Sequence, residues 1–521
     1  MDCVSDKGSL HDYLELNTPC FAVQGENIKV LNSPSEFYCC LIDGIMSAKR
    51  RIVLSALYLG TGEKEEKLVQ CLDEALHRSV VDNRSLDVSI LFDYVRGSRG
   101  SKNSKTILLP LLKHHDSSAG TNKLEVSFYH TPSLRGAWKQ FLPARFNEVI
   151  GLNHLKIFIF DDTFIISGAN LSTEYFHQRQ DRYMQFNNCN LLANHFQTLV
   201  KAVSSFSFQL QSDGSLKFSE QCPYHPFNGN YSQFISFANR SLQSLLNPYQ
   251  SVIASDSNAV IERQPGLFSS VFSSAVYLLQ AIGFMKENKN NRDVAFTESN
   301  GAPQHRQEHS DPDTFIFPTL QMGIAGVRQD ERVTKLLLES FPSKSHVCFT
   351  SGYFNITDDY SNAVLSSSAN FDILTASPEA NGFLGASGFA GNIPAVYIYF
   401  TRLFFEQLTK NESQKRIKIW EYMQPQWTYH AKGIWFCEEG QSLPSATMIG
   451  SSNFGLRSVN RDLEAQVILI TKNRKLMEQL QTEKANLLKW SKPVTPETFA
   501  QPRYFVPRWV CYVSNLIKHY F

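Results

Sequence analysis

The sequence predicts an α/β protein made of two tandem halves, each a mixed β-sheet flanked by helices, with an active site at their interface. Two observations support this fold class. A set of polar residues, His and Lys two positions apart followed by Asn and an acid, occurs twice in the same order. In addition, apolar runs typical of strands alternate with helical patterns in both parts of the chain. Because internal self-similarity is typical of a duplicated unit, we expect both halves to have the same fold.

The first polar set begins in the segment 154–160, which is rich in β-forming residues and which we expect to be a β-strand. Residues two positions apart share a face of a strand, so His154 and Lys156 should point the same way. A turn at 161–163 and a return strand at 164–167 should then bring the next polar residues to the same surface. The candidate residues of this set are His154, Lys156, Asp161, Asn170 and Asp181.

The second polar set follows the same plan with a longer connection, residues 438–445, between its two strands. Cys437 occupies the position that corresponds to Asp161 in the first set, and Glu438 comes one position late. The final acid lies at the same distance beyond its Asn as in the first set. The candidate residues here are His430, Lys432, Asn453 and Glu464.

Together the two sets have the chemistry of a phosphoryl-transfer site. A neutral imidazole is a nucleophile at neutral pH, and Lys and Asn side chains donate hydrogen bonds to oxyanions. Two such sets facing each other require no metal ion and no cofactor. Satisfied polar residues at a sheet edge would explain either set alone, but they do not explain the repetition of the whole set.

The elements around the two sets also repeat. In the first half, we expect strands at 51–59, 86–92 and 124–129 and a helix at 64–79. In the second half, we expect strands at 345–353, 371–376, 396–400 and 416–422. The predicted organisation is an N-terminal extension at 1–29, a first half at 30–285, a polar loop at 286–313 and a second half at 314–521.

A basic, glycine-containing loop directly follows the strand expected at 86–92. Glycines expose backbone N–H groups and Arg and Lys supply charge, a combination that suits a phosphate. The corresponding segment of the second half, 378–388, lacks these cations. An ordinary solvated basic loop explains the composition equally well. The candidate phosphate-binding residues are Arg96, Arg99 and Lys102.

Composition excludes several classes of protein. The 521 residues carry a net charge of +1, which is not the basic balance of a nucleic-acid enzyme. The ten Cys are scattered without a CxxC pair, so neither structural zinc nor a disulfide framework is expected, and a reducing compartment is the default. No apolar run reaches the ~18 residues of a spanning helix, and the longest candidate, 275–285, is short.

The two ends of the chain leave alternatives open. The first residues, Met1-Asp-Cys-Val, form neither a signal peptide nor a convincing transit peptide. The C-terminal segment 503–521 mixes aromatic residues with Arg508, Lys518 and His519. That composition suits a bilayer interface, and a docked terminal element explains it equally well.

At the polar sets the chain resembles the phospholipase D superfamily, whose signature is HxKxxxxD followed by Gly-Ser-x-Asn. The first set matches at His154, Lys156 and Asp161 and departs at 167–170, where the small residues are permuted. The second set keeps Gly450-Ser-Ser-Asn453 but has Cys437 in place of the motif Asp. Further segments resemble the eukaryotic CDP-diacylglycerol–glycerol-3-phosphate 3-phosphatidyltransferase family, namely 96–100, 152–156, 167–172, 179–183, 376–383 and 430–433.

This resemblance implies transfer of a phosphatidyl group from CDP-diacylglycerol to glycerol 3-phosphate, as a step toward phosphatidylglycerol and cardiolipin. It implies an enzyme at a membrane surface, on the matrix side of the mitochondrial inner membrane, with no nucleic-acid partner. Two alternatives remain. The first is a phospholipase D-type hydrolase or another CDP-diacylglycerol-dependent phosphatidyltransferase, and the second is an inactive lipid-binding homologue.

The resemblance also implies a double displacement. His154, in the more complete motif, would be the nucleophile that forms a phosphatidyl-histidine, and His430 would be the general base. Asp181 and Glu464 would each orient a histidine. The remaining polar residues would stabilise the charged transition state, namely Lys156, Lys432, Asn170 and Asn453.

Overall fold

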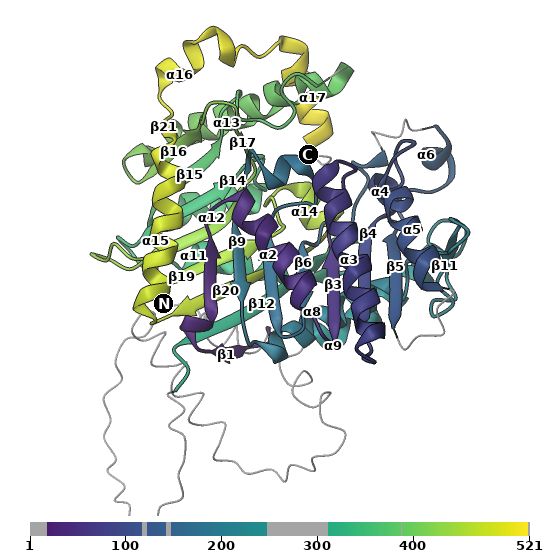
Figure 1. Ribbon diagram of the computed structural model, residues 1–521. Helices are drawn as coiled ribbons and strands as arrows, with labels where there is room; N and C mark the ends of the chain where they lie inside the picture. The colour runs from purple at the N-terminus through teal and green to yellow at the C-terminus, as the bar shows by residue number, and fades with distance from the viewer. Residues whose placement is uncertain (1–17, 117–121, 142–146, 247–310, 387, 519–521) are drawn as a thin grey trace, which may run out of the picture.

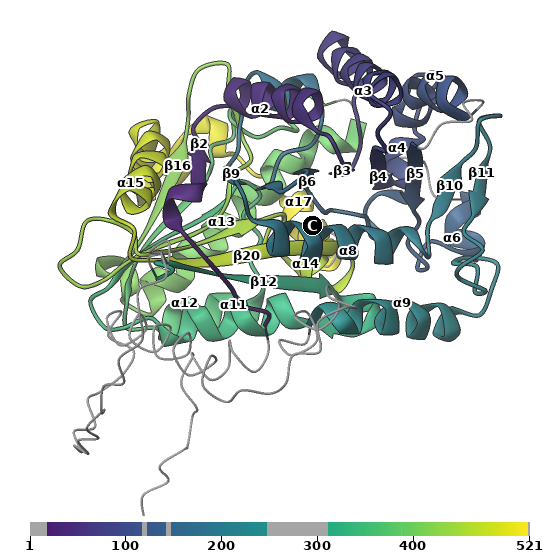
Figure 2. The same cartoon turned by 60° about the horizontal axis from the view of Figure 1, so that its bottom comes forward.

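A computed structural model of the chain describes residues 18–116, 122–141, 147–246, 311–386 and 388–518. Two large mixed β-sheets dominate it, and helices cover them (Figures 1 and 2). Most of the polar loop predicted at 286–313 and all of the apolar run at 275–285 lie outside the described residues. Within the described part of the chain, no helix is long and apolar enough to cross a membrane.

The first sheet has nine strands in the order β11-β10-β5-β4-β3-β6-β7-β9-β2. β3, β4 and β5 pair in parallel. On the other side of β3, the strands β6, β7, β9 and β2 follow in this order, and each pairs antiparallel with the one before it. The bounds are β2 Ile28–Leu31, β3 Arg51–Ser55, β4 Asp87–Asp93, β5 Lys123–Tyr129, β6 Ile157–Phe160, β7 Thr163–Ser167, β9 Tyr183–Phe186, β10 Phe208–Leu210 and β11 Leu216–Phe218.

The second sheet repeats this arrangement in the order β1-β12-β20-β19-β18-β14-β15-β16-β21, with β13 paired to β12. β14, β15 and β16 are parallel, and β14 continues antiparallel through β18, β19 and β20 to β12. The bounds are β1 Phe21–Val23, β12 Thr314–Met322, β13 Val327–Arg328, β14 His346–Ser351, β15 Asn370–Ala376, β16 Ile417–Tyr422, β18 Lys432–Cys437, β19 Ala446–Gly450, β20 Leu463–Thr471 and β21 Ser491–Pro493.

The matching strand orders confirm the predicted α/β class with a duplicated unit. Strands of both sheets are covered on both faces, which explains their continuous apolar runs. In β6, Ile157 and Ile159 face a core that includes residues of both sheets, whereas Phe158 and Phe160 face the helices of the first half. In β18, Trp435 faces the same shared core.

Helices flank each sheet as expected. In the first half they are α2 Pro34–Ser47, α3 Glu63–Val81, α4 Tyr94–Gly97, α5 Ser104–Asp116, α6 Gly136–Phe141, α8 Asn190–Ser204 and α9 Tyr231–Leu246. In the second half they are α11 Gln329–Ser340, α12 Asp358–Ser366, α13 Ile393–Lys410, α14 Leu456–Asn460, α15 Arg474–Lys489, α16 Pro496–Ala500 and α17 Arg508–Ile517.

The sequence prediction for one element of the second half is wrong. The strand expected at 396–400 is part of helix α13. Two sides of this helix are buried. Phe404 and Leu408 pack on the second sheet, while Val396 and Phe400 pack under the C-terminal segment. Burial on two sides produces an apolar pattern that resembles that of a β-strand. Within the segment predicted to be an N-terminal extension, 1–29, the described residues contain β1, which pairs with β12, and the start of β2.

A buried arginine of the first half joins the two halves. The Arg182 guanidinium binds both carboxylate oxygens of Glu483 on α15, at 3.0 and 2.9 Å, and stacks 3.7 Å from the ring centre of Trp435. It also donates to the Met448 carbonyl at 2.8 Å. A Cβ at Gly433 would lie 2.3 Å from this guanidinium, so glycine is required there.

Candidate active site

Both histidines lie just before their strands rather than inside them. The strands begin at Ile157 and Lys432, so the predicted strand starting at His154 is too long at its N-terminal end. Each histidine is instead held by a contact to the opposite half. The His154 N–H donates to the Leu463 carbonyl at 2.9 Å, and the His430 N–H donates to the Gln180 carbonyl at 2.8 Å.

These backbone contacts place each histidine against the acid of the other half. Leu463 directly precedes Glu464, whose carboxylate lies 2.9 Å from Nδ1 of His154. Gln180 directly precedes Asp181, whose carboxylate lies 2.7 Å from Nδ1 of His430. Both acids have fully buried side chains. A carboxylate at Nδ1 fixes the tautomer with the lone pair on Nε2, the nitrogen that can attack an electrophile or accept a proton.

The pairing is reinforced by a short parallel bridge between the halves. β8, Arg179–Gln180, pairs with β17, Thr428–Tyr429, directly before Asp181 and His430. On the other side, Asn153 forms an isolated bridge with Leu463, directly before His154 and Glu464. The backbone bridges beside the two His–acid pairs are therefore equivalent.

The two lysines lie under their histidines. Lys156 Nζ donates to the His154 carbonyl at 2.7 Å, and Lys432 Nζ donates to the His430 carbonyl at 2.8 Å. Burial lowers the pKa of Lys156 to about 7 and the pKa of Lys432 to about 8. An anionic phosphate would reverse this effect by favouring the ammonium forms.

Burial also sets the charge of the histidines. It lowers the pKa of both His154 and His430 well below the ordinary value, and the neighbouring lysines add to this effect. The imidazoles are therefore neutral at neutral pH, as a nucleophile or a general base requires. Burial raises the pKa of Asp181 to about 6, an effect that Lys432 opposes.

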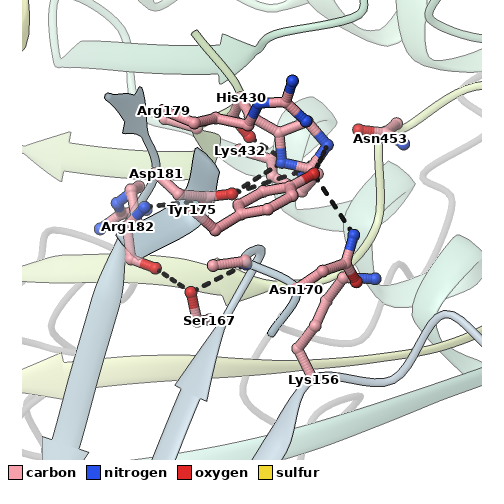
Figure 3. Close-up of polar contacts among 12 residues, drawn as sticks. Lys156, Ser167, Asn170, Tyr175, Arg179, Asp181, Arg182, His430, Lys432 and Asn453 are labelled. Carbon is pink, nitrogen blue, oxygen red and sulfur yellow. Dashed lines mark hydrogen bonds and ion pairs between the residues drawn. The ribbon is translucent and has the colours of Figure 1, made fainter. Parts of the chain in front are cut away.

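The two asparagines complete the set. Asn170 accepts from the Leu57 N–H at 3.3 Å and donates to the Tyr175 hydroxyl at 3.3 Å. The side-chain oxygen of Asn453 is buried with no hydrogen-bond partner among the described residues. Figure 3 draws Asn170 and Lys156 of the first half in one view with Asn453 and Lys432 of the second, and marks the contact of Asn170 with Tyr175. A Cβ at Gly168 would lie 2.5 Å from the Asp181 carboxylate, which explains the small residue in this segment.

Sequence reasoning missed three groups beside His430. The Tyr175 hydroxyl lies 3.3 Å from His430 Nε2. The ring of Tyr353 packs edge-on against His430 with centres 5.3 Å apart. The Arg179 guanidinium stacks 4.7 Å from the Tyr175 ring, and a Cβ at Gly382 would lie 2.9 Å from it (Figure 3). Arg179 shares a strand face with Asp181 two residues later, a spacing that could have revealed it.

Asp462 was missed in the same way, two residues before Glu464. It forms an ion pair with Arg457 at 2.9 Å and accepts from the Leu152 N–H. Ligand atoms of His154, Asp462 and Glu464 lie within 4.8 Å of one another, an arrangement that could hold a metal ion. In this structure His154 Nδ1 contacts Glu464 at 2.9 Å, and Asp462 contacts Arg457 at 2.9 Å.

Asp161 does not lie with the other candidates. It sits in the turn after β6, at the end of that strand remote from Lys156, with a φ of +51°. Its carboxylate accepts from the backbone N–H groups of Lys49, Arg50 and Arg51 at 2.8–3.0 Å. The expectation that Asp161 acts in catalysis is therefore corrected, because its contacts are those of a residue that braces a turn.

The equivalent position in the second half has different contacts. Cys437 ends β18, and its sulfur accepts from Lys484 Nζ at 3.5 Å. The longer connection that follows β18 replaces the tight turn of the first half, so no carboxylate is needed at this position. Like the contacts of Asp161, the contact of Cys437 is made with a residue outside the two polar sets.

The predicted phosphate-binding cations are engaged in other contacts. Arg99 forms an ion pair with Glu148, and Lys102 forms one with Glu66 at 2.7 Å. Arg96 stacks 3.9 Å from the ring centre of Tyr58, whose hydroxyl donates to Ser172. Of the three, only Arg96 is thereby linked to the segment that carries Asn170.

Comparisons with known proteins give a consistent result. No family model matches the chain. The mitochondrial CDP-diacylglycerol–glycerol-3-phosphate 3-phosphatidyltransferase of Gallus gallus is 41% identical over 510 residues, covering 96% of this chain and 85% of the relative. The Homo sapiens protein of the same name is 41% identical over 96% of this chain and 84% of its own length. The Saccharomyces cerevisiae protein is 32% identical over 92% of this chain and 85% of its own length.

The fold has a solved counterpart. The crystal structure of phosphatidylserine synthase from Haemophilus influenzae superposes with a TM-score of 0.64 over 98% of this chain and 99% of that chain. At 19% sequence identity this likeness shows the fold alone.

Proposed function

Because this chain belongs to the CDP-diacylglycerol–glycerol-3-phosphate 3-phosphatidyltransferase family, we propose that it transfers a phosphatidyl group from CDP-diacylglycerol to glycerol 3-phosphate. The products are phosphatidylglycerophosphate and CMP, which places the reaction before phosphatidylglycerol and cardiolipin. The observation that supports the chemistry is the pair of buried neutral histidines, each bound at Nδ1 to a carboxylate of the opposite half.

In the first step, His154 Nε2 attacks the phosphorus that carries the diacylglycerol. A P–N bond forms, the P–O bond to CMP breaks, and CMP leaves as a stable anion. A phosphatidyl-histidine remains, so that one difficult transfer becomes two easier ones. Glu464 stabilises the positive charge that develops on this imidazole. We assign this role to His154, and isolation of a phospho-adduct on His430 instead would reverse the assignment.

In the second step, His430 accepts the proton of the sn-1 hydroxyl of glycerol 3-phosphate. The alkoxide oxygen attacks the same phosphorus, the P–N bond breaks, and His154 is released neutral. Asp181 stabilises the protonated His430, which then loses its proton to water. Lys156, Lys432, Asn170 and Asn453 donate to the equatorial oxygens of the transition state.

The second substrate carries its own phosphate, which needs a cationic partner. We assign this role to Arg179, which is half-buried beside His430 and hydrogen-bonded through Nε to Thr428 at 3.0 Å. Arg99 and Lys102 are less suited, since each already binds a carboxylate.

The acceptor can be tested with one labelled donor. The purified chain is given CDP-diacylglycerol with water, glycerol 3-phosphate, serine or phosphatidylglycerol in parallel. We expect phosphatidylglycerophosphate from glycerol 3-phosphate and little product from the other three acceptors.

The covalent intermediate has its own test. Exchange of labelled CMP into CDP-diacylglycerol without any acceptor is expected, and the full reaction should proceed with net retention of configuration at phosphorus. Product from water or serine alone would refute the proposed acceptor, and net inversion would refute the covalent intermediate.

The location follows from the substrate and the relatives. CDP-diacylglycerol has two acyl chains and resides in a bilayer, so the enzyme works at a membrane surface. The Gallus gallus and Homo sapiens relatives are named mitochondrial. We propose the matrix side of the inner membrane for this chain, and protease protection in isolated mitochondria with and without their outer membrane would test it.

A further inference from the structure

The C-terminal segment has one buried and one exposed apolar side. η6 (Pro502–Tyr504) and α17 (Arg508–Ile517) pack on α13 through Tyr504, Val506 and Val510, which are buried together with Val396, Ile398 and Phe400. The opposite side is exposed and also apolar. Its large side chains, with their exposed fractions, are Phe505 at 72%, Trp509 at 47%, Tyr512 at 79% and Leu516 at 71%.

The exposed side chains recur at the spacing of a single helix face. Trp509, Tyr512 and Leu516 are three and four positions apart, which places them on one stripe of α17. Burial of Val510 and Ser514 on the other side shows that the helix is already docked through its inner face. The outer stripe is therefore not required for attachment to α13.

The C-terminal end of α17 lies near the active site. The Lys518 carbonyl, just after α17, accepts from Asn355, and Lys518 Nζ binds Asp358 at 2.6 Å. Asn355 is two residues from Tyr353, which packs on His430. Both views show the end of α17 close to α14, the helix that begins three residues after Asn453 (Figures 1 and 2).

A second exposed apolar residue lies in the same region. Leu384 is 58% exposed and follows Phe383, whose ring lies 5.5 Å from that of Tyr353. The start of the C-terminal segment is tied to this loop, since Arg503 binds Glu379 at 2.9 Å. Exposed apolar side chains from two distant parts of the sequence thus gather around the residues that pack on His430.

We propose that this surface, defined by Phe505, Trp509, Tyr512, Leu516 and Leu384, docks on the face of a phospholipid bilayer. Trp and Tyr are the side chains favoured at membrane interfaces, and the exposed Arg508 at the start of α17 suits anionic headgroups. The proposal rests on the proposed function, because a lipid donor whose acyl chains stay in the bilayer needs the phosphorus brought to His154 and His430 at the membrane surface. Docking through α17 places those residues beside that surface.

The test uses the full chain and vesicles of phosphatidylcholine with an anionic phospholipid. The variant Trp509→Ser/Tyr512→Ser/Leu516→Ser removes the stripe, and Val81→Ser/Leu191→Ser changes exposed apolar residues on α3 and α8 as the matched control. In vesicle sedimentation we expect the stripe variant to bind at least about tenfold more weakly than the wild type. The control should bind like the wild type, and both should unfold at the wild-type temperature.

Two further measurements distinguish a failure of membrane docking from a failure of the proposed phosphatidyl transfer. With a short-chain, water-soluble CDP-diacylglycerol, the stripe variant should release CMP at the wild-type rate, while its rate on vesicle substrate falls. Vesicle binding itself does not depend on catalysis, so a wild type that binds through α17 but releases no CMP would refute only the reaction. Unchanged vesicle binding by the variant would overturn the docking proposal.

A conservative variant covers the case in which the triple variant folds poorly. Trp509→Phe keeps the apolar face, and brominated lipids should quench less of its fluorescence than that of the wild type. Equal quenching would show that Trp509 does not enter the bilayer and would overturn the proposal. A wild-type dimer that the stripe variant converts to a monomer, with vesicle binding unchanged, would assign the surface to a second copy of the chain instead.

Discussion

Replacing one buried acid should disable the histidine of the opposite half. Asp181 belongs to the first half but binds His430, and Glu464 belongs to the second half but binds His154. Asp181→Asn and Glu464→Gln keep the size of each side chain and remove its charge. If His154 is the nucleophile, Glu464→Gln should slow both CMP exchange and transfer. Asp181→Asn should slow transfer to glycerol 3-phosphate while CMP exchange persists at its wild-type rate.

The size of the effect follows from the geometry. Each acid is fully buried and makes one hydrogen bond of 2.7 or 2.9 Å to Nδ1. Loss of a hydrogen bond to a charged group costs about 1.5–3 kcal/mol, which corresponds to about a 10- to 100-fold lower rate. An amide can also stabilise the wrong imidazole tautomer, which raises the loss to about 10⁴-fold. A loss near the larger value would show that the acids select the tautomer.

The assay measures CMP exchange and phosphatidyl transfer in the same preparation. His430→Ala and His154→Ala serve as references for the two acid variants. If each acid acts on the histidine of the opposite half, Asp181→Asn should change the two rates in the same way as His430→Ala. Glu464→Gln should likewise change them in the same way as His154→Ala. If Asp181→Asn instead matched His154→Ala and Glu464→Gln matched His430→Ala, the proposed action of each acid on the opposite half would be refuted. Loss of exchange in Asp181→Asn with retention in Glu464→Gln would show that His430 is the nucleophile.

Three further predictions concern stability and pH. Arg182→Met leaves the Glu483 carboxylate buried without its partner, so urea unfolding should show a loss of about 3–5 kcal/mol, and the double variant with Glu483→Gln should recover part of it. Asp161→Asn removes the charge that binds three backbone N–H groups. It should lower the unfolding temperature but leave the CMP exchange rate of the folded protein within a fewfold, and a loss as large as that of His154→Ala would contradict this. Because a bound phosphate favours protonated Lys156 and Lys432, the affinity for CMP should fall as the pH rises through about 7 and about 8, whereas a rising affinity would exclude both lysines as phosphate ligands.

Much of the chemistry could be predicted from local patterns. His and Lys two positions apart, repeated with Asn and an acid, indicated the nucleophile, the base and their supporting cations, and the structure brings these residues together. The strands around them were also predictable, because doubly covered strands are continuous apolar runs. The same pattern predicted Asp161 as a site residue. Asp161 lies away from the histidines because it follows the last residue of β6, and the sequence does not show where that strand ends. Helix α13 was misread because a helix buried on two sides imitates the period of a strand.

The sequence by itself determined the duplicated α/β fold and which residue types occupy the reactive set, since the spacing that puts His beside Lys is local. Only the tertiary structure decided that each acid serves the histidine of the other half. That pairing depends on the bridges β8–β17 and Asn153–Leu463, which join residues hundreds of positions apart. It depends equally on Arg182, which ties the first half to α15. The hydrophobic periodicity of the sequence cannot predict such contacts, because they arise only when the two sheets pack against each other.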